Sequence, residues 1–302
     1  MKSVLAEVEG LIEEQAVSWP KLAQGLRGLR ESRTRSVMVG NYNVLVRHIP
    51  HRITSTTAPV DAASVARRPC FLCAANLPPE EHGVELSSEF IGYCNPYPIL
   101  ERHLTIVHRD HIPQAIGGRL RAMADIARSL PGFFLIYNGP ECGASAPDHL
   151  HFQACSRAIF PIEQDTSGFS GLSFPHAVRR VFVVEDEDAG RLSDRLDRLI
   201  AVIASVTGKI PEPLLNLAMF HDGGRWKSFV FPRDKHRPRV YETGELTVSP
   251  ATIDLCGIFV VPLSGDYERI SGSDIEHIFA EVTLNAEAHK AVVGRIAEEH
   301  HS

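Results

Sequence analysis

The sequence has no long apolar run, and this absence limits its class first. No stretch of the 302 residues approaches the roughly 20 apolar residues that a helix needs to cross a bilayer. Residues 1–7 also lack the apolar segment and cleavage signature of a secretory signal. We therefore expect a cytoplasmic protein without a membrane partner.

An excess of positive charge is also missing. The chain has 31 Lys and Arg residues against 37 Asp and Glu residues, which gives a formal net charge of −6. Nucleic-acid-binding proteins typically carry a basic surface, so we expect no nucleic acid partner. A single bound nucleotide is not excluded, because its pocket needs only local positive charge.

Cysteine is scarce. Of the six cysteines only Cys70 and Cys73 are close in sequence, and in a reducing compartment such a pair is more typical of a metal or redox site than of a structural disulfide. A thioredoxin-type motif would open a helix after a central strand, and the Pro-Pro-Glu-Glu run at residues 78–81 makes that context poor. The C-x-x-C motif therefore favours zinc, with two more ligands from elsewhere, over redox chemistry or inert thiols.

A second informative stretch is residues 131–156. An apolar strand at residues 133–137 is expected to lead into a loop of small residues, and a second strand is expected to carry residues 148–153. Side chains two apart in a strand share a face, so His149, His151 and Gln153 should project together. The alternative is a strand with two surface histidines.

The loop between these two strands contains Gly139, Gly143 and Ser145. Small residues leave backbone N–H groups exposed, and a row of such groups suits an anionic phosphate. Earlier in the chain, Arg52 and the hydroxyl residues after it could contact a phosphate as well, with a solvated loop as the alternative.

The pattern N-G-x-x-x-G-x-S from Asn138 to Ser145, followed by H-x-H-x-Q, resembles the galactose-1-phosphate uridylyltransferase branch of the histidine-triad superfamily. Its form H-L-H-F-Q-A looks most like the GDP-hexose phosphorylases, with diadenosine tetraphosphate phosphorylases next. The resemblance implies that His151 attacks an α-phosphate and forms a nucleotidyl-histidine, with Gln153 donating to a phosphate oxygen. Ser145 lies four residues before His149 where the family usually has three, so Ala146 is the alternative for the serine's place.

The same resemblance implies a structural zinc site. Carried over residue by residue, its ligands are Cys70, Cys73, His111 and His149. His103 and His108 are alternatives for the third place.

Two further stretches resemble the phosphorylases. The Asn95-Pro96-Tyr97-Pro98 turn is similar to their N-x-[FY]-P stretch, which implies that Asn95 lies near the ribose or base, while a simple β-turn is the alternative. Residues 248–261 resemble a segment near the C-terminus of the same enzymes.

The chain also repeats itself. Helix, apolar strand, glycine loop and alternating strand occur in residues 114–156 and again in residues 191–231. We therefore expect an α+β fold of the histidine-triad type, with two pseudo-repeated halves, residues 1–165 and 166–302, whose largely antiparallel sheets are flanked by helices.

The second copy lacks the histidines of the first. In the uridylyltransferases the matching strand reads W-x-x-H-x-H and binds a second metal, and here those positions are Phe229 and Phe231. The second half is therefore expected to hold no metal and no nucleophile. Its basic residues could still reach a phosphate, with a charged surface loop as the alternative; they are Lys227, Arg233, Lys235 and Arg237.

These patterns together predict a nucleotidyltransferase of the phosphorylase type. Its substrate would be a nucleoside diphosphate sugar or a dinucleoside polyphosphate, and phosphate would be the acceptor. The alternatives are a hexose-1-phosphate nucleotidyltransferase of the same chemistry, a nucleotide hydrolase and a non-catalytic zinc protein that binds a nucleotide. A homodimer paired through a sheet edge is an open possibility for this superfamily.

Overall fold

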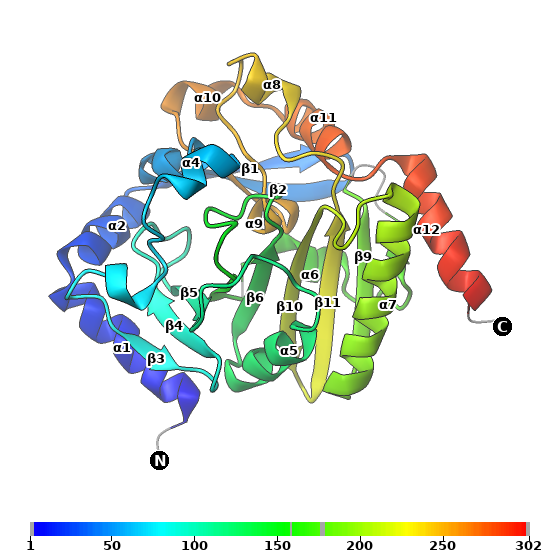
Figure 1. Ribbon diagram of the computed structural model, residues 1–302. Helices are drawn as coiled ribbons and strands as arrows, with labels where there is room; N and C mark the ends of the chain where they lie inside the picture. Colours follow the sequence, from blue (N-terminus) through cyan, green and yellow to red (C-terminus); the bar gives the residue numbers. More distant parts are fainter. Residues whose placement is uncertain (1–2, 158, 176–178, 300–302) are drawn as a thin grey trace.

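The computed structural model describes residues 3–157, 159–175 and 179–299. Within them, nine strands form one sheet in which every neighbouring pair is antiparallel, and three form a smaller sheet (Figure 1). The large sheet runs, in spatial order, β3 (Gly83–Glu85), β4 (Phe90–Cys94), β5 (His103–His108), β7 (His151–Ser156), β6 (Phe133–Asn138), β10 (Leu215–Asp222), β11 (Arg225–Pro232), β9 (Val181–Asp186) and β8 (Ser173–Phe174).

The strand order of the large sheet is symmetric about its centre. Strands β5, β7 and β6 of the first half are followed by β10, β11 and β9 of the second, and β6 pairs with β10 where the halves meet. The expected α+β fold with pseudo-repeated antiparallel halves is confirmed. A boundary between residues 165 and 166 stays a prediction, since one sheet runs through both halves.

One face of the large sheet is covered by helices. The apolar sides of these helices form one core with alternate residues of the strands, such as Leu135, Phe152 and Leu217. The covering helices are α1 (Val4–Ser18), α2 (Pro20–Arg30), α5 (Leu120–Ser129), α7 (Ala189–Thr207) and α12 (Ala286–Glu299). No helix in the described ranges has both the length and the apolar character to cross a membrane.

The opposite face is covered over its second half by the small sheet and three helices. In that sheet β1 (Arg33–Val39) pairs with β2 (Tyr42–His48), and β2 pairs in parallel with β12 (Ile258–Val261). The helices are α9 (Thr252–Leu255), α10 (Ser264–Arg269) and α11 (Gly272–Val282). Figure 1 shows the blue strands β1 and β2 beside the orange α10 and α11, so two segments far apart in the sequence build this layer together.

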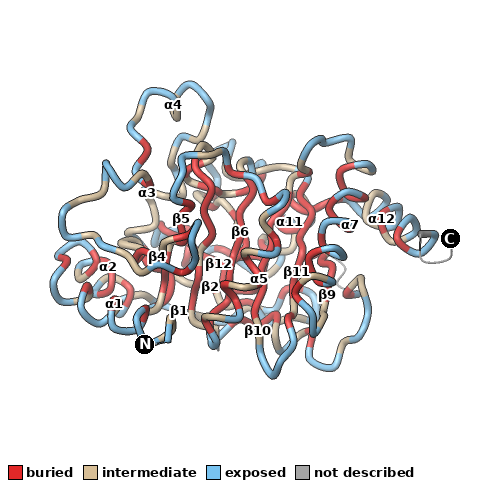
Figure 2. The backbone as a smooth tube through the Cα atoms, turned by 60° about the horizontal axis from the view of Figure 1, so that its bottom comes forward, coloured by how far each residue is buried: buried red, intermediate tan, exposed pale blue. Residues whose placement is uncertain are grey.

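A second core lies between this layer and the large sheet. Its strand residues include Ile136, Ala218 and Phe229, each at most 1% exposed. Figure 2 shows the central strands buried between the two covering layers. Short segments complete the fold: the 3-10 helices η1 (Pro50–Arg52) and η2 (Ala74–Asn76) and the helices α3 (Ile53–Thr56), α4 (Ala62–Ala66), α6 (Pro161–Asp165) and α8 (Arg239–Glu242).

Strand β7 differs from the prediction in a way that matters for the site. It begins at His151, and His149 lies in a bend before it. The expectation that His149, His151 and Gln153 share one strand face is therefore wrong for His149. Leu150 and Phe152 are fully buried in the helix-covered core.

Candidate active site and metal cluster

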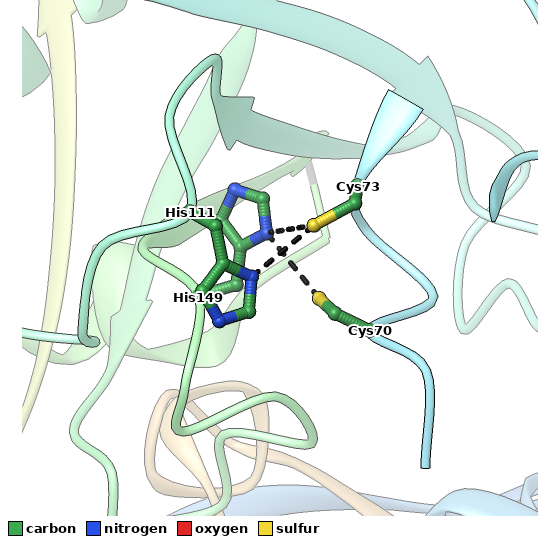
Figure 3. Close-up of side chains that lie close together, drawn as sticks. All are labelled: Cys70, Cys73, His111 and His149. Carbon is green, nitrogen blue, oxygen red and sulfur yellow. Dashed lines mark hydrogen bonds between the residues drawn. The ribbon is translucent and has the colours of Figure 1, made fainter. Parts of the chain in front are cut away.

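Four metal-ligating side chains come together from three separate segments. The Sγ atom of Cys70 lies 3.3 Å from Nδ1 of His149, and the Sγ atom of Cys73 lies 3.1 Å from Nδ1 of His111 and 3.6 Å from Nδ1 of His149. The four ligand atoms all lie within 4.8 Å of one another. Figure 3 shows both imidazoles facing the two thiols.

This geometry fits a tetrahedral ion. Zinc bonds of about 2.3 Å to sulfur and about 2.0 Å to nitrogen place neighbouring S and N ligand atoms about 3.6 Å apart. Each imidazole also has a contact at the ring nitrogen that faces away from the thiols. Nε2 of His149 donates to the carbonyl oxygen of His108 at 2.8 Å, which leaves Nδ1 unprotonated and able to bind a metal. Nε2 of His111 lies 3.7 Å from a carboxylate oxygen of Asp148. The four residues could therefore hold a metal ion.

The two alternative histidines are engaged elsewhere. His103 bonds to Gln153, and Nδ1 of His108 bonds to the backbone of Asp110. The third potential metal ligand, beside the two cysteines, is therefore His111.

His151 is held by two hydrogen bonds that fix its ring and its backbone. Its Nδ1–H donates to the carbonyl oxygen of His149 at 2.8 Å, so the lone pair is on Nε2. Its backbone N–H donates to Oε1 of Gln114 at 2.8 Å. Burial lowers the pKa of the imidazole to about 4.

Gln114 was not anticipated from the sequence. Its buried carboxamide also donates to the carbonyl oxygens of Asn138 and His151 at 2.8 and 3.0 Å. It thereby ties the end of β6 to the start of β7. A polar residue at a loop boundary carries no pattern that predicts this contact.

His151 lines a cavity of about 540 Å³, a volume in the range of small-molecule sites. Five other expected site residues line the same cavity: Asn95, Asn138, Gly143, Ser145 and Gln153. Four basic side chains also line it: Lys21, Arg52, Arg68 and Arg237. Local positive charge and amide groups therefore surround the histidine although the whole chain is acidic.

The carboxamide of Asn138 faces the cavity in a defined orientation. Its Oδ1 accepts from Nδ2 of Asn216 at 2.7 Å and from the backbone N–H and hydroxyl of Thr252 at 3.1 and 2.6 Å. Because a backbone N–H can only donate, the oxygen position is fixed. No described residue accepts from Nδ2, which leaves this donor to a ligand.

Asn95 is engaged in its own turn. Its Oδ1 accepts from the backbone N–H of Tyr97 at 2.9 Å, and its Nδ2 lies 3.3 Å from the hydroxyl of Thr105. This is the local turn that asparagine favours. The residue thus forms the turn and also lines the cavity.

The small-residue loop needs Gly143. This residue has φ +98°, and a Cβ there would lie 2.7 Å from Cβ of Ala251. Of the two alternatives for the serine's place, Ser145 lines the cavity, whereas Ala146 is fully buried in the small core beneath the cysteines.

Two expected phosphate ligands do not reach the cavity. Arg233 is 2% exposed, and its guanidinium donates to Asn216, Pro250, Val282, Lys235 and His236. The Nζ of Lys227 bonds to Thr166 and Glu185 instead. A guanidinium with every N–H donor used cannot bind a substrate phosphate, so the structure contradicts this role for Arg233. Lys227 does not line the cavity, and its phosphate-binding role stays a prediction. Lys235 pairs with Glu281, away from the cavity.

Sequence reasoning missed several cavity residues. Among them, Lys21, Arg68 and Asp254 come from separate parts of the chain, and no motif joins them. Asp254 accepts from the backbone N–H groups of Ala251 and Val260, and burial raises its pKa to about 6. The resemblance of residues 248–261 to the phosphorylases was the one signal that pointed to this segment.

Two family models match consecutive parts of the chain. Residues 11–156 match a "Domain of unknown function (DUF4922)", and residues 173–302 match the model described as "GDPGP1-like, C-terminal domain". Among curated proteins compared by sequence, none matches this chain significantly.

Solved structures of yeast Ap4A phosphorylase Apa2 share the fold. The structure in complex with AMP has a TM-score of 0.59 at 14% identity, covering 94% of this chain and 98% of that one. Apa2 alone has a TM-score of 0.56 at 16% identity, covering 88% and 96%. Apa2 in complex with Ap4A has a TM-score of 0.55 at 14% identity, covering 89% and 97%.

At these identities the structural matches speak for the fold, and the C-terminal family model adds a match in sequence. The resemblance expected from the H-x-H-x-Q and C-x-x-C motifs is supported: residues 173–302 match the GDPGP1-like C-terminal model, and the chain shares its fold with Apa2.

Proposed function

We propose that the protein is a nucleotidyltransferase of the phosphorylase type, which transfers a nucleotidyl group from a nucleoside diphosphate sugar or a dinucleoside polyphosphate to phosphate. The observation that carries the proposal is the state of His151. Its Nδ1–H is held by a backbone carbonyl, and the ring lines a cavity with basic and amide groups. Support also comes from the GDPGP1-like family model and from Apa2, which is named a phosphorylase and has been solved with AMP and Ap4A.

The proposed reaction has two displacements at one phosphorus atom. In the first, Nε2 of His151 forms a bond to the α-phosphorus while the bond to the bridging oxygen breaks, and the sugar 1-phosphate leaves with that oxygen. In the second, an oxygen of inorganic phosphate attacks the same phosphorus and the P–N bond breaks. The product is a nucleoside diphosphate, and the histidine is restored.

Hydrogen bonding supports the nucleophile through both steps. The carbonyl oxygen of His149, which accepts from Nδ1–H, stabilises the positive charge that the ring acquires when Nε2 bonds to phosphorus. A neutral imidazole aimed in this way needs no separate general base.

The cavity supplies donors for the phosphate oxygens. Nδ2 of Asn138 is available, and the hydroxyl of Ser145 lines the same wall. Arg52 donates to the carbonyl oxygen of Tyr97 through Nη1, and the rest of its guanidinium faces the cavity. Donors that are already in place stabilise the charge of the transition state without reorganisation.

The metal cluster is proposed to be a structural zinc site. Cys70, Cys73, His111 and His149 would fill a tetrahedral shell and leave no open position, which is the structural type. A bound ion would fix the bend that precedes β7, and the backbone of that bend holds the His151 ring.

The space around the cavity suits a substrate with two parts. A second cavity of about 720 Å³ adjoins the first and shares Lys21, Thr54, Pro96 and Tyr97 with it. The nucleotidyl group would occupy the cavity of His151. The sugar phosphate or second nucleotide would extend toward the neighbouring one.

One experiment tests the proposal. The purified protein is incubated with nucleoside diphosphate sugars and dinucleoside polyphosphates, with and without phosphate, and released nucleoside diphosphate is measured by chromatography. Labelling with an α-³²P substrate follows the covalent intermediate. We expect phosphate-dependent release and a labelled protein, and His151→Ala should abolish both. His82→Ala, a histidine whose side chain is 52% exposed, is the matched control.

The alternatives give different results. Labelling of the His151→Ala variant at the wild-type rate would overturn the nucleophile assignment. Turnover without phosphate would indicate a hydrolase, and turnover only with a hexose 1-phosphate would indicate the uridylyltransferase type of acceptor. A homodimer stays a prediction, which sedimentation of the intact protein tests.

A further inference from the structure

A buried histidine lies directly behind the carboxamide of Gln153. His103 opens β5, is 3% exposed and does not line the cavity. Its ring has two partners: the backbone N–H of Ile99 lies 3.1 Å from Nδ1, and Oε1 of Gln153 lies 2.8 Å from Nε2. The sequence marked this residue only as a possible metal ligand, and the metal cluster does not use it.

The first partner fixes the tautomer of the ring. The backbone N–H of Ile99 can only donate, so Nδ1 of His103 must accept and the ring proton is on Nε2. Nε2–H therefore donates to Gln153, and the atom that accepts there must be the carboxamide oxygen. The two ends of a glutamine amide are alike in shape, but this chain of donors distinguishes them.

The orientation decides what Gln153 offers to a ligand. With Oε1 turned back to His103, the NH₂ group faces the cavity, and no described residue accepts from it. In the opposite orientation the carbonyl oxygen would face the phosphate, and two electronegative oxygens would repel each other. The same amide thus helps or hinders a phosphate depending on its rotation.

His103 stays in one protonation state at ordinary pH. Burial, together with a smaller effect of the nearby guanidinium of Arg52, lowers the pKa of its imidazole to about 3. A protonated ring would carry a hydrogen on Nδ1 and oppose the N–H of Ile99. Burial therefore keeps the single tautomer that the geometry requires.

We propose that His103 is a positioning residue that holds the carboxamide of Gln153 with its NH₂ group toward the α-phosphate. The inference rests on the proposed function for its effect on turnover. Its structural part, the chain from Ile99 through His103 to Gln153, stands on the hydrogen bonds alone. Loss of an outer partner of this kind typically lowers activity by about 10- to 100-fold.

A matched pair of variants separates positioning from packing. In His103→Asn the amide oxygen can replace Nδ1 as acceptor for Ile99, but the donor to Gln153 is lost. In His103→Gln the amide NH₂ can replace Nε2–H as donor to Gln153, but the acceptor for Ile99 is lost. We expect kcat to fall roughly 10- to 100-fold in His103→Asn and to be largely kept in His103→Gln.

Stability should follow a different order. His103→Gln leaves a buried backbone N–H without a partner, so it should be the less stable of the two variants. If kcat instead follows thermal stability across both variants, His103 is only structural and the proposal is overturned. KM for the nucleotide substrate should change less than kcat, because the lost interaction strengthens as charge moves in the transition state.

A double-mutant cycle tests whether His103 acts through Gln153. In a Gln153→Ala background, His103→Asn should cause no further loss of kcat. An equal loss in both backgrounds would show that His103 acts by another route and would overturn the proposal.

A measurement that needs no turnover tests the role of His103 independently of the proposed function. Nitrogen-15 NMR of the histidines should show Nε2 of His103 protonated and Nδ1 unprotonated in the wild-type protein at pH 7. If that is seen and no substrate turns over, the proposed function fails while the orientation of Gln153 stands. If Nδ1 carries the proton, the positioning role is overturned even in an active enzyme.

Discussion

The two halves of the large sheet share a frame but differ on one face. In the first half the strand next to the central pair is β7, and His151 and Gln153 face a cavity from it. In the second half the matching strand is β11, and Phe229 and Phe231 are fully buried under the small sheet and α11. The strand arrangement therefore does not make a site by itself.

The neighbours of these side chains explain the difference. Gln153 has Thr105 and Ile136 opposite it on the adjacent strands, whereas Phe229 lies opposite Ala218 and Val183. Burying a phenylalanine stabilises a fold by about 1.5–3 kcal/mol, whereas a buried polar group needs a hydrogen-bond partner. In one half this face lines the candidate site, and in the other it is packed into the core.

The largest effect is expected from breaking the metal cluster of the first half. Cys73→Ser should prevent binding of the proposed zinc ion, because structural zinc sites bind with about 10–16 kcal/mol at pH 7 and a hydroxyl is a poor substitute for a thiolate. Metal analysis of the dialysed protein measures this, with one equivalent expected in the wild type. Cys256→Ala, a buried cysteine outside the cluster, is the control. Equal metal content in both variants would contradict the assignment.

A smaller effect is expected from a substitution that leaves a cavity in the core of the second half. Phe229→Ala should lower the free energy of unfolding by about 3–5 kcal/mol, since it leaves a cavity in a packed core. Urea denaturation measures the loss. Metal content should stay at one equivalent, because no residue of the cluster touches this core. A loss of unfolding free energy below about 1 kcal/mol would show that Phe229 is not tightly packed in this core.

The smallest effect concerns the pH dependence of the unfolding free energy, and it involves His103 in the first half. The pKa of His103 is about 3 in the folded protein, below the value of about 6.5 expected in the unfolded chain. The unfolded state therefore binds more protons between these values, and the contribution of His103 to stability, complete above pH 6.5, is lost as the pH falls toward 3. His103→Asn should reduce the slope of unfolding free energy against pH by at most about 1.4 kcal/mol per unit.

Urea unfolding at several pH values between 5 and 7 measures this slope. The groups that set the effect are the burial of the ring, its bond to Gln153 and the charge of Arg52. Identical slopes in variant and wild type would mean that the ring titrates normally.

Sequence reasoning predicted the parts of the site that depend on local pattern. His151 and Gln153 lie on a strand as expected, the small-residue loop precedes it, and Cys70, Cys73, His111 and His149 come together. Within residues 180–231 the strands and helix of the second copy occur in the predicted order. These features follow from residue spacing, which the chain itself carries.

The predictions that failed concern residues whose roles depend on contacts with distant parts of the chain. Arg233 is basic and was expected to reach a phosphate, yet it donates all its N–H groups to the protein. His149 lies in a bend before β7, where its ring faces the thiols of Cys70 and Cys73. Lys21 and Arg68 reach the cavity from distant segments, and spacing along the chain cannot reveal such convergence.

The buried Arg233 has one more consequence. It donates to Oδ1 of Asn216, Asn216 donates to Oδ1 of Asn138, and the other end of Asn138 faces the cavity. A residue of the second half thus fixes the orientation of an amide that lines the cavity of the first half. A chain divided between β6 and β10 would lose this orientation even if each fragment folded. The cavity of the first half therefore depends on the presence of the second half.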